Sequence, residues 1–184
     1  MRRKILTLHL LLAAFMAPAF IMVAVSGGLY LLGVKGAEAE TNISAPSQET
    51  FDIVIDESRN PSDLEADVRA LINQLGLDID FEYLRVRGTS LTTRPTSREH
   101  LFVSNTDQGL EILKRTPDLQ SSMMELHKGH GPTLYKTYQK WVAVGLIFVM
   151  LSGLWMGLSN KALRQRTLVS LGLGLVTFVV LILL

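Results

Sequence analysis

The sequence of 184 residues contains no cysteine. Disulfide bonds, thiolate metal ligands and thiol nucleophiles are therefore excluded together, and any exported domain must be stabilised by its own core. Acidic residues are confined to the middle of the chain, because all 17 lie between Glu38 and Glu125. No run of basic residues interleaved with aromatic ones is present, so the sequence does not indicate binding to nucleic acid.

Charged side chains are also missing from three long apolar segments. Residues 5–32 contain none except for a possible charge on His9, and residues 141–158 and 167–184 contain none at all. A helix crosses the roughly 30 Å apolar core of a lipid bilayer with about 20 residues. The sequence therefore predicts an integral membrane α-helical protein with three transmembrane helices.

Basic residues flank these segments asymmetrically. Three precede the first segment at residues 2–4, three more lie at positions 161, 164 and 166, and neither place contains an acid. Short basic loops remain in the cytoplasm, so we expect a cytoplasmic N-terminus and an outer C-terminus. Residues 33–140 then lie outside, with a net charge of −5 from 12 basic and 17 acidic residues.

The first apolar segment has a second interpretation, as a secretory signal cleaved after residues 37–39. Signal peptides have apolar cores of about 7–15 residues, whereas this segment has 28, which favours an uncleaved anchor. The glycine-rich, proline-containing first span and the short loops favour a bacterial inner membrane. The main domain is then periplasmic.

The outer region has the pattern of a small α+β domain. Asn60-Pro61 is typical of a helix start, and apolar residues at helical spacing continue to Gly76, which closes the helix. Further elements are predicted by their patterns: strands at 51–56, 80–87, 91–94 and 99–104, and helices at 106–116 and 119–127. The expected organisation is a cytoplasmic N-terminus at 1–4, a transmembrane helix at 5–32, a flexible stalk at 33–50, a periplasmic domain at 51–131, a juxtamembrane segment and second helix at 132–158, a cytoplasmic loop at 159–166 and a third helix at 167–184.

One juxtamembrane motif is more specific to a protein family than the patterns described above. LHKGHGP at residues 126–132 lies just outside a span that contains LSGLW at residues 151–155. With the basic cluster at residues 2–4, His9 and Ser26-Gly27, it resembles the PepSY-associated transmembrane proteins of bacterial inner membranes, particularly a short branch with three spans. The Trp and Gly that often follow the first-span histidine in that family are replaced here by leucines. The resemblance implies a PepSY-like module, in which a helix packs on a small antiparallel sheet.

Two of the spans have similar sequences. FIMVAVSGGLY at residues 20–30 and LIFVMLSGLWM at residues 146–156 align on their Ser-Gly pairs, which the topology places near opposite membrane faces. Either an inverted repeat or the low complexity of apolar segments accounts for this similarity. Five small residues are predicted to allow close contacts between helices: Ser26, Gly27, Ser152, Gly153 and Gly157.

Histidine is the only residue type here suited to holding haem, which larger relatives of the resembled family carry. A b-type haem between helices needs two imidazoles at one depth. His9 lies near the cytoplasmic end of the first span, whereas His127 and His130 lie just outside the opposite face. About 30 Å of bilayer separates them, so His9 can share an iron only with His9 of a second copy in a homodimer. The alternative is that His9 simply reaches the membrane interface.

His127 and His130 are three residues apart and would share one helix face. With Glu125 or another third ligand they form a candidate transition-metal site, although two imidazoles alone make a weak one. A bend before the membrane, caused by the adjacent glycines and proline, is the alternative. His100 is expected on the surface of the sheet.

No paired carboxylates, Ser/His/Asp set or phosphate-binding glycine loop emerges, so no catalytic residue is assigned. The sequence favours a non-catalytic inner-membrane protein whose periplasmic domain docks or modulates a membrane or periplasmic protein partner. The alternative is a haem- or iron-handling redox protein, similar to ferric-siderophore reductases, that acts as a dimer or as a subunit. No cofactor is assigned, and haem b is the candidate cofactor under this alternative.

Overall fold

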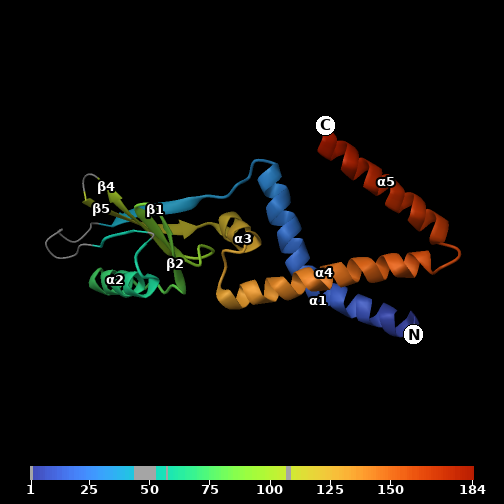
Figure 1. The fold of residues 1–184 in the computed structure, drawn as a ribbon, viewed down its shortest axis with the longest axis horizontal. Coiled ribbons are helices and arrows are strands. Elements are labelled where there is room, and N and C mark those ends of the chain that lie inside the picture. The colour runs from blue at the N-terminus through green and yellow to red at the C-terminus, as the bar shows by residue number, and fades with distance from the viewer. Residues whose placement is uncertain (1, 44–52, 57, 107–108) are drawn as a thin grey trace. The chain divides into compact units, whose positions relative to one another are not determined.

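The computed structural model describes residues 2–43, 53–56, 58–106 and 109–184. The chain divides into two compact units. Met1–Phe20 and Lys140–Leu184 form the first, which we call the helical unit, and Ile21–Gln139 form the second, which we call the sheet unit. Helices α1 (Arg2–Leu31) and α4 (Thr133–Leu158) contribute residues to both units (Figure 1).

Three helices are long and apolar enough to cross a membrane, as the sequence predicts. They are α1 (Arg2–Leu31), α4 (Thr133–Leu158) and α5 (Arg164–Leu183), with mean hydropathies of 2.3, 2.0 and 2.2 over their most apolar windows. Many of their large apolar side chains are exposed, including Phe15 at 69% and Phe178 at 64%. Such extensive apolar exposure is unfavourable in water, and lipid is the solvent that suits it.

Close packing within the helical unit occurs at glycines. A Cβ atom at Gly145 of α4 would overlap the thioether of Met16, a residue of α1 that is only 3% exposed. A Cβ at Gly157 of α4 would lie 2.7 Å from the hydroxyl oxygen of Thr167 in α5. Helices without a hydrophobic driving force between them associate through such small residues.

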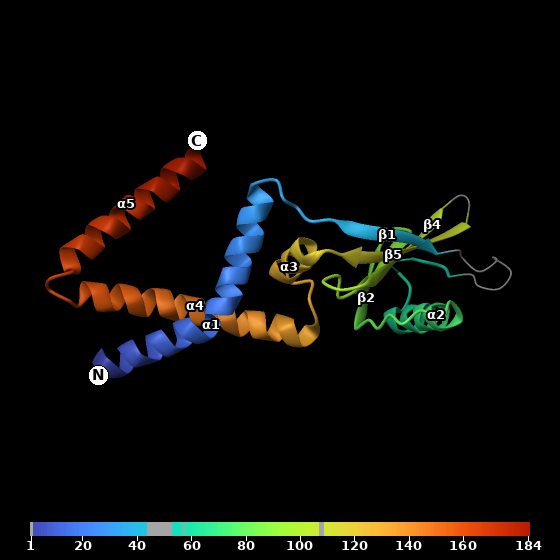
Figure 2. The same ribbon diagram turned by 180° about the vertical axis from the view of Figure 1, so that it is seen from behind.

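The sheet unit contains a five-stranded antiparallel sheet. Its strands are β1 (Glu38–Ile43), β2 (Tyr83–Arg87), β3 (Ser90–Arg94), β4 (His100–Thr106) and β5 (Gly109–Pro117). The spatial order is β1-β5-β4-β3-β2, so β2 to β5 form a meander and β1 adds to its far edge (Figure 2). The predicted strands at 80–87, 91–94 and 99–104 are confirmed, within a few residues at each end.

Two segments that were not predicted as strands form strands β1 and β5. Glu38–Ile43, expected within a flexible stalk, is strand β1, and its backbone pairs with β5 from Glu38↔Pro117 to Ile43↔Ile112. The segment expected to be a helix at 106–116 is mostly strand β5. It returns antiparallel beside β4, and Gly109 at its start has a positive φ of 113° that only glycine adopts readily. The remainder of the expected stalk, residues 44–50, lies outside the described residues.

The segment expected to be a strand at 51–56 is also different. Ile53–Asp56 has no regular secondary structure, and residues 51 and 52 lie outside the described part. Ile53 and Ile55 are nevertheless buried, at 1% and 5% exposure. Their apolar side chains therefore belong to the hydrophobic core, although the backbone of this segment is not paired in the sheet.

Helix α2 (Pro61–Gln74) forms where the sequence predicts it and covers one face of the sheet (Figure 1). The Asn60 side chain caps it by accepting from the Ser62 amide at 3.1 Å. Its buried residues, from Leu64 to Ile72, pack against strand residues such as Leu101 and Val103, which are fully buried. These contacts form the one hydrophobic cluster of the sheet unit's described residues.

Helix α3 (Leu119–His127) is confirmed as well and is fastened to the end of α1. Its cap, Asp118, accepts hydrogen bonds from the Ser121 amide at 2.7 Å and the Ala37 amide at 2.9 Å. The Gln120 amide group donates to the backbone carbonyls of Ser26 at 3.0 Å and Val34 at 3.1 Å. These bonds position α3 within the sheet unit.

Candidate functional site

In the helical unit, His9 of α1 is bonded to Ser152 of α4. His9 Nδ1 lies 2.8 Å from Ser152 Oγ, and the Ser152 hydroxyl donates to the backbone carbonyl of Val149 at 3.1 Å. A serine hydroxyl has a single proton, which can serve only one of these two bonds. When it is donated to Val149, Ser152 Oγ accepts from His9 Nδ1–H, and in the tautomer with that proton the lone pair of the ring lies on Nε2.

In the sheet unit, His127 of α3 has the same arrangement with Ser26 of α1. His127 Nδ1 lies 3.3 Å from Ser26 Oγ, and the Ser26 hydroxyl donates to the carbonyl of Val23 at 3.2 Å. Ser26 is completely buried. When the Ser26 proton is donated to Val23, Ser26 Oγ accepts from His127 Nδ1–H, as in the first arrangement.

A glycine follows each of these serines and makes room for the imidazole. A Cβ atom at Gly153 would lie 3.3 Å from His9 Cε1, and one at Gly27 would lie 3.4 Å from His127 Cε1. The serine therefore orients the imidazole ring, and the glycine, which has no side chain, leaves space for the edge of the ring. We call the two arrangements histidine seats: His9 on Ser152-Gly153, and His127 on Ser26-Gly27.

The two seats use the two Ser-Gly pairs of the similar span sequences. The sequence predicted these small residues as helix-packing positions, but did not pair them with histidines. The missed partners are far apart along the chain, separated by 143 residues in one seat and 101 in the other. The similarity between the spans, taken with one histidine near each, is the sequence signal that could have indicated the seats.

Imidazoles in this state are suited to binding a metal. A ligating histidine usually donates its second ring N–H to a neighbouring acceptor, which fixes the tautomer and orients the ring. Each seat provides that acceptor and leaves Nε2 available. Each also contains one imidazole, so a second axial ligand must come from elsewhere.

His130 is placed differently from His127. Its Nδ1 lies 2.7 Å from Glu125 Oε2 and is not directed at a serine. Among the described residues, no group of three or more His, Asp or Glu side chains is placed to hold a metal. The transition-metal site at His127 and His130 thus stays a prediction, with no third ligand assigned.

Glu125 is the centre of a polar cluster at the end of α3. Its carboxylate accepts from the Thr96 hydroxyl at 2.5 Å and from Lys128 at 3.2 Å, and Arg94 lies 3.5 Å away. Burial raises the pKa of Glu125, but the hydrogen bonds from Thr96, His130 and Lys128 together outweigh this effect and lower the pKa to about 2. The carboxylate is therefore ionised at any physiological pH and anchors the segment that enters α4.

His100 is buried, which corrects the expectation that it lies on the sheet surface. It is 2% exposed, and its Nδ1 lies 2.9 Å from the carbonyl oxygen of Arg98. Burial lowers the pKa of His100, although the hydrogen bond to Arg98 opposes that effect. A neutral, satisfied imidazole of this kind is a structural residue.

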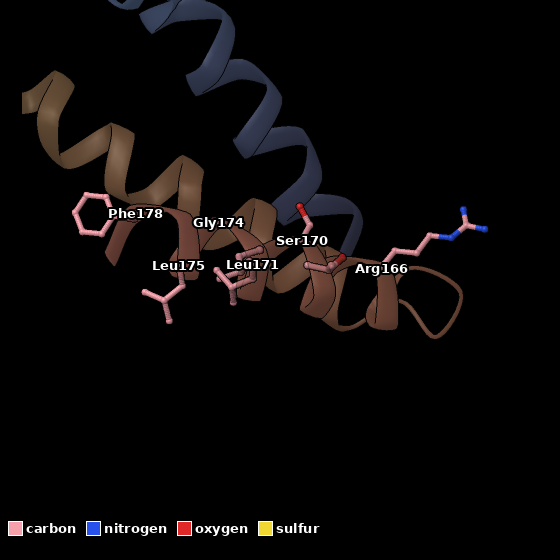
Figure 3. Close-up of a pocket in the computed structure, with 8 residues that line it drawn as sticks. Arg166, Ser170, Leu171, Gly174, Leu175 and Phe178 are labelled. Carbon is pink, nitrogen blue, oxygen red and sulfur yellow. The ribbon is translucent and has the colours of Figure 1, made fainter. Parts of the chain in front are cut away.

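A groove of about 640 Å³ runs along α5 beside Leu154 of α4 (Figure 3). Arg166 lies at one end of it, and its lining includes Leu171, Leu175 and Phe178 of α5. The lining has no acid, imidazole or second basic group. It therefore offers no set of groups for chemistry.

The histidine seats are consequently the best-defined arrangement of ligating groups in the described residues. Comparison with known proteins adds no identification: the chain matches no model of a protein family, no curated protein and no solved structure.

Proposed function

We propose that this is a haem-handling membrane protein in which the histidine seats hold axial ligands between two copies of the chain. The observation that carries the proposal is the shared geometry of His9 and His127, each with Nδ1 directed at the serine of a Ser-Gly pair. It favours the redox alternative of the sequence analysis over docking alone. The proposal also includes a PepSY-like module in the sheet unit and a location in the bacterial inner membrane.

A homodimer supplies the second ligand for a simple geometric reason. Two copies inserted in the same orientation place identical residues at identical depth in the membrane. His9 of one copy then lies at the same depth as His9 of the other copy, and the same holds for His127. When bound, a haem with two imidazole ligands would supply one-electron chemistry. The serines would orient the ligands, and the glycines would let the rings lie close to the helix backbone.

The donor set fits such a group in two respects. Neutral imidazole is a common axial ligand of haem iron, and a hydrogen bond to the second ring nitrogen raises its basicity. The lipid-facing side chains beside His9 are apolar, as in Leu6 and Leu10, which are 43% and 56% exposed. An apolar surface of this kind is compatible with a porphyrin, which is itself largely apolar.

The experiment is optical analysis of the full chain, purified in a mild detergent from cells supplied with haem. We expect a Soret band, with one haem per chain if both seats are occupied in a dimer. His9→Ala should remove half of that haem, His127→Ala the other half, and the double variant all of it. His130→Gln is the matched control, because His130 is bonded to Glu125 and not to a serine, and should retain the full band.

The serines provide a second readout. Ser152→Ala should leave part of the haem in place but weaken its binding by about 10–100-fold, the usual effect of losing such a hydrogen bond. A colourless, iron-free preparation would refute the proposal. So would a Soret band of unchanged intensity in the double histidine variant.

A second candidate function is docking of a protein partner by the sheet unit, which would then be non-catalytic. It is favoured by the sheet face opposite α2, where Phe102 of the inner strand β4 is only partly buried. Crosslinking in intact membranes followed by purification should return one specific partner. A chain recovered without any partner, at normal expression, would count against docking and leave the haem proposal unaffected.

A further inference from the structure

Four of the seven arginines between residues 33 and 140 line one groove of the sheet unit. The groove has a volume of about 320 Å³, and no acidic residue lines it. This concentration runs against the charge of the surrounding region, which is −5 overall. The lining residues come from β2, β3, β4, β5 and the segment before α4: Arg85, Arg87, Ser90, Thr92, Arg94, Phe102, Arg115 and His130.

The register of the sheet explains why these side chains share a face. Arg85 pairs with Thr92 and Arg87 with Ser90 across β2 and β3, and Thr92 pairs in turn with Phe102 of β4. Residues directly opposite in antiparallel strands project to the same side. This is the face away from α2, because the core residues Leu91 and Val103 occupy the alternate positions.

Two of the arginines are partly neutralised inside the fold. Arg115 forms an ion pair with Glu40 at 2.9 Å and lies 4.6 Å above the Phe102 ring. Arg94 faces Glu125 at 3.5 Å. Both are thereby held in fixed orientations, and the buried Nε of Arg115 still has no hydrogen-bond partner in the described part of the chain.

The other two arginines have no such partner. Within the described ranges, neither Arg85 nor Arg87 lies within ion-pair distance of a carboxylate. Burial lowers the pKa of Arg94, the charge of Glu125 raises it, and the nearby charges of Arg85 and Arg87 lower it. The groove therefore has about two positive charges without compensation.

Protection of a sheet edge explains only part of this pattern. Charged residues on edge strands discourage pairing with other chains, and β2 is the edge strand that carries Arg85 and Arg87. Arg94 and Arg115, however, lie on the inner strands β3 and β5. Edge protection gives no reason for those two side chains to converge on the same groove.

We propose that this groove binds the phosphate group of a phosphomonoester. A phosphomonoester has a charge of about −1.5 to −2 at neutral pH, which matches the two uncompensated arginines. Guanidinium groups bind phosphate oxygens in bidentate fashion, and the Thr92 hydroxyl, which also lines the groove, is a further donor. The volume leaves room for the group that the phosphate esterifies. That group is either a soluble compound or the glycerol of a lipid such as phosphatidic acid.

The test uses the full chain in phosphatidylcholine nanodiscs, titrated calorimetrically with inorganic phosphate. Arg85→Gln should weaken phosphate binding at least about tenfold, because a hydrogen bond between two charged groups contributes more than about 1.4 kcal/mol, which corresponds to a factor of ten. Arg98→Gln is the matched control. Arg98 is an exposed arginine of the same unit that pairs with Asp80 and does not line the groove, so its loss should leave binding unchanged.

The two sources of the phosphate are separated by a second set of nanodiscs that contain phosphatidic acid. Unchanged phosphate binding in these discs identifies a soluble ligand, whereas competition by the lipid, lost in Arg85→Gln, identifies a headgroup. The inference is overturned if phosphate does not bind, or if both variants lose binding equally. It is also overturned if a polyglutamate peptide binds through Arg85 more tightly than phosphate, since the groove would then serve an acidic protein partner. None of these outcomes depends on haem.

Discussion

Replacing Glu125 by glutamine should destabilise the sheet unit in a pH-dependent way. The folded-state pKa of Glu125 is about 2, against an ordinary value of 4.5, and each pKa unit corresponds to about 1.4 kcal/mol. Its side chain is only 14% exposed, so screening by solvent reduces this effect little. The ionised carboxylate therefore contributes about 3 kcal/mol to the free energy of unfolding at neutral pH.

The sign of the pH dependence follows from the lowered pKa. The contribution is fully present above the unfolded pKa of about 4.5 and disappears as the pH falls towards the folded pKa of about 2. Glu125→Gln should thus be about 3 kcal/mol less stable than the natural chain at neutral pH, with the difference vanishing at the acid end.

Urea unfolding in a non-ionic detergent, followed by far-UV circular dichroism at several pH values, measures this difference. Glu99→Gln is the control, because Glu99 pairs with Lys114 at 2.9 Å but is 47% exposed, and exposed pairs contribute about 0–1 kcal/mol. The reasoning is refuted if Glu125→Gln is as stable as the natural chain at neutral pH. A difference that persists undiminished in acid would refute it equally.

Three further substitutions test the packing of the sheet unit by the same unfolding measurement. Thr93→Val should cost about 1–3 kcal/mol, because the buried Leu101 amide donates to the Thr93 hydroxyl at 2.8 Å; a loss below 0.5 kcal/mol would show that the amide finds another acceptor. Leu101→Ala, at a fully buried position, should cost about 2–5 kcal/mol, and stability within error of the natural chain would place Leu101 outside the cooperative core. Gly36→Ala should cost about 1–3 kcal/mol, because Gly36 has a φ of 81° and a Cβ there would overlap the Ser121 backbone; unchanged hydrogen exchange at the start of α3 would contradict this.

The parts of the fold that could be predicted are those with a local cause. Missing charges define α1, α4 and α5 regardless of what they contact, because the bilayer selects for apolar composition along a whole segment. Helix α2 was predicted because Asn60-Pro61, the apolar face and Gly76 all lie within one short stretch. Helix α3 was also predicted as a short helix at 119–127, and the structure shows Asp118 as its capping residue.

The elements that were missed depend on distant partners. Strand β1 is polar, and only pairing with β5 makes Glu38–Ile43 a strand. In β5 the residues Leu110, Ile112 and Leu113 suit a helical spacing as well as an extended one, and the neighbouring strand β4 decides the outcome. The histidine seats have the same origin, since nothing near His9 in the sequence specifies its bond to Ser152.

The pairing of β1 with β5 has a mechanical consequence. β1 follows α1 directly, and β5 leads through α3 to α4, so both membrane helices are attached at the same end of this strand pair. A displacement of one helix from the other would therefore peel the strands apart from Glu38↔Pro117 inward, one backbone bond after another, instead of shearing the whole ladder at once. The first bonds to bear the separating force are the two hydrogen bonds between Ala37 and Asp118, each 2.9 Å long, which hold the two strands together at this end.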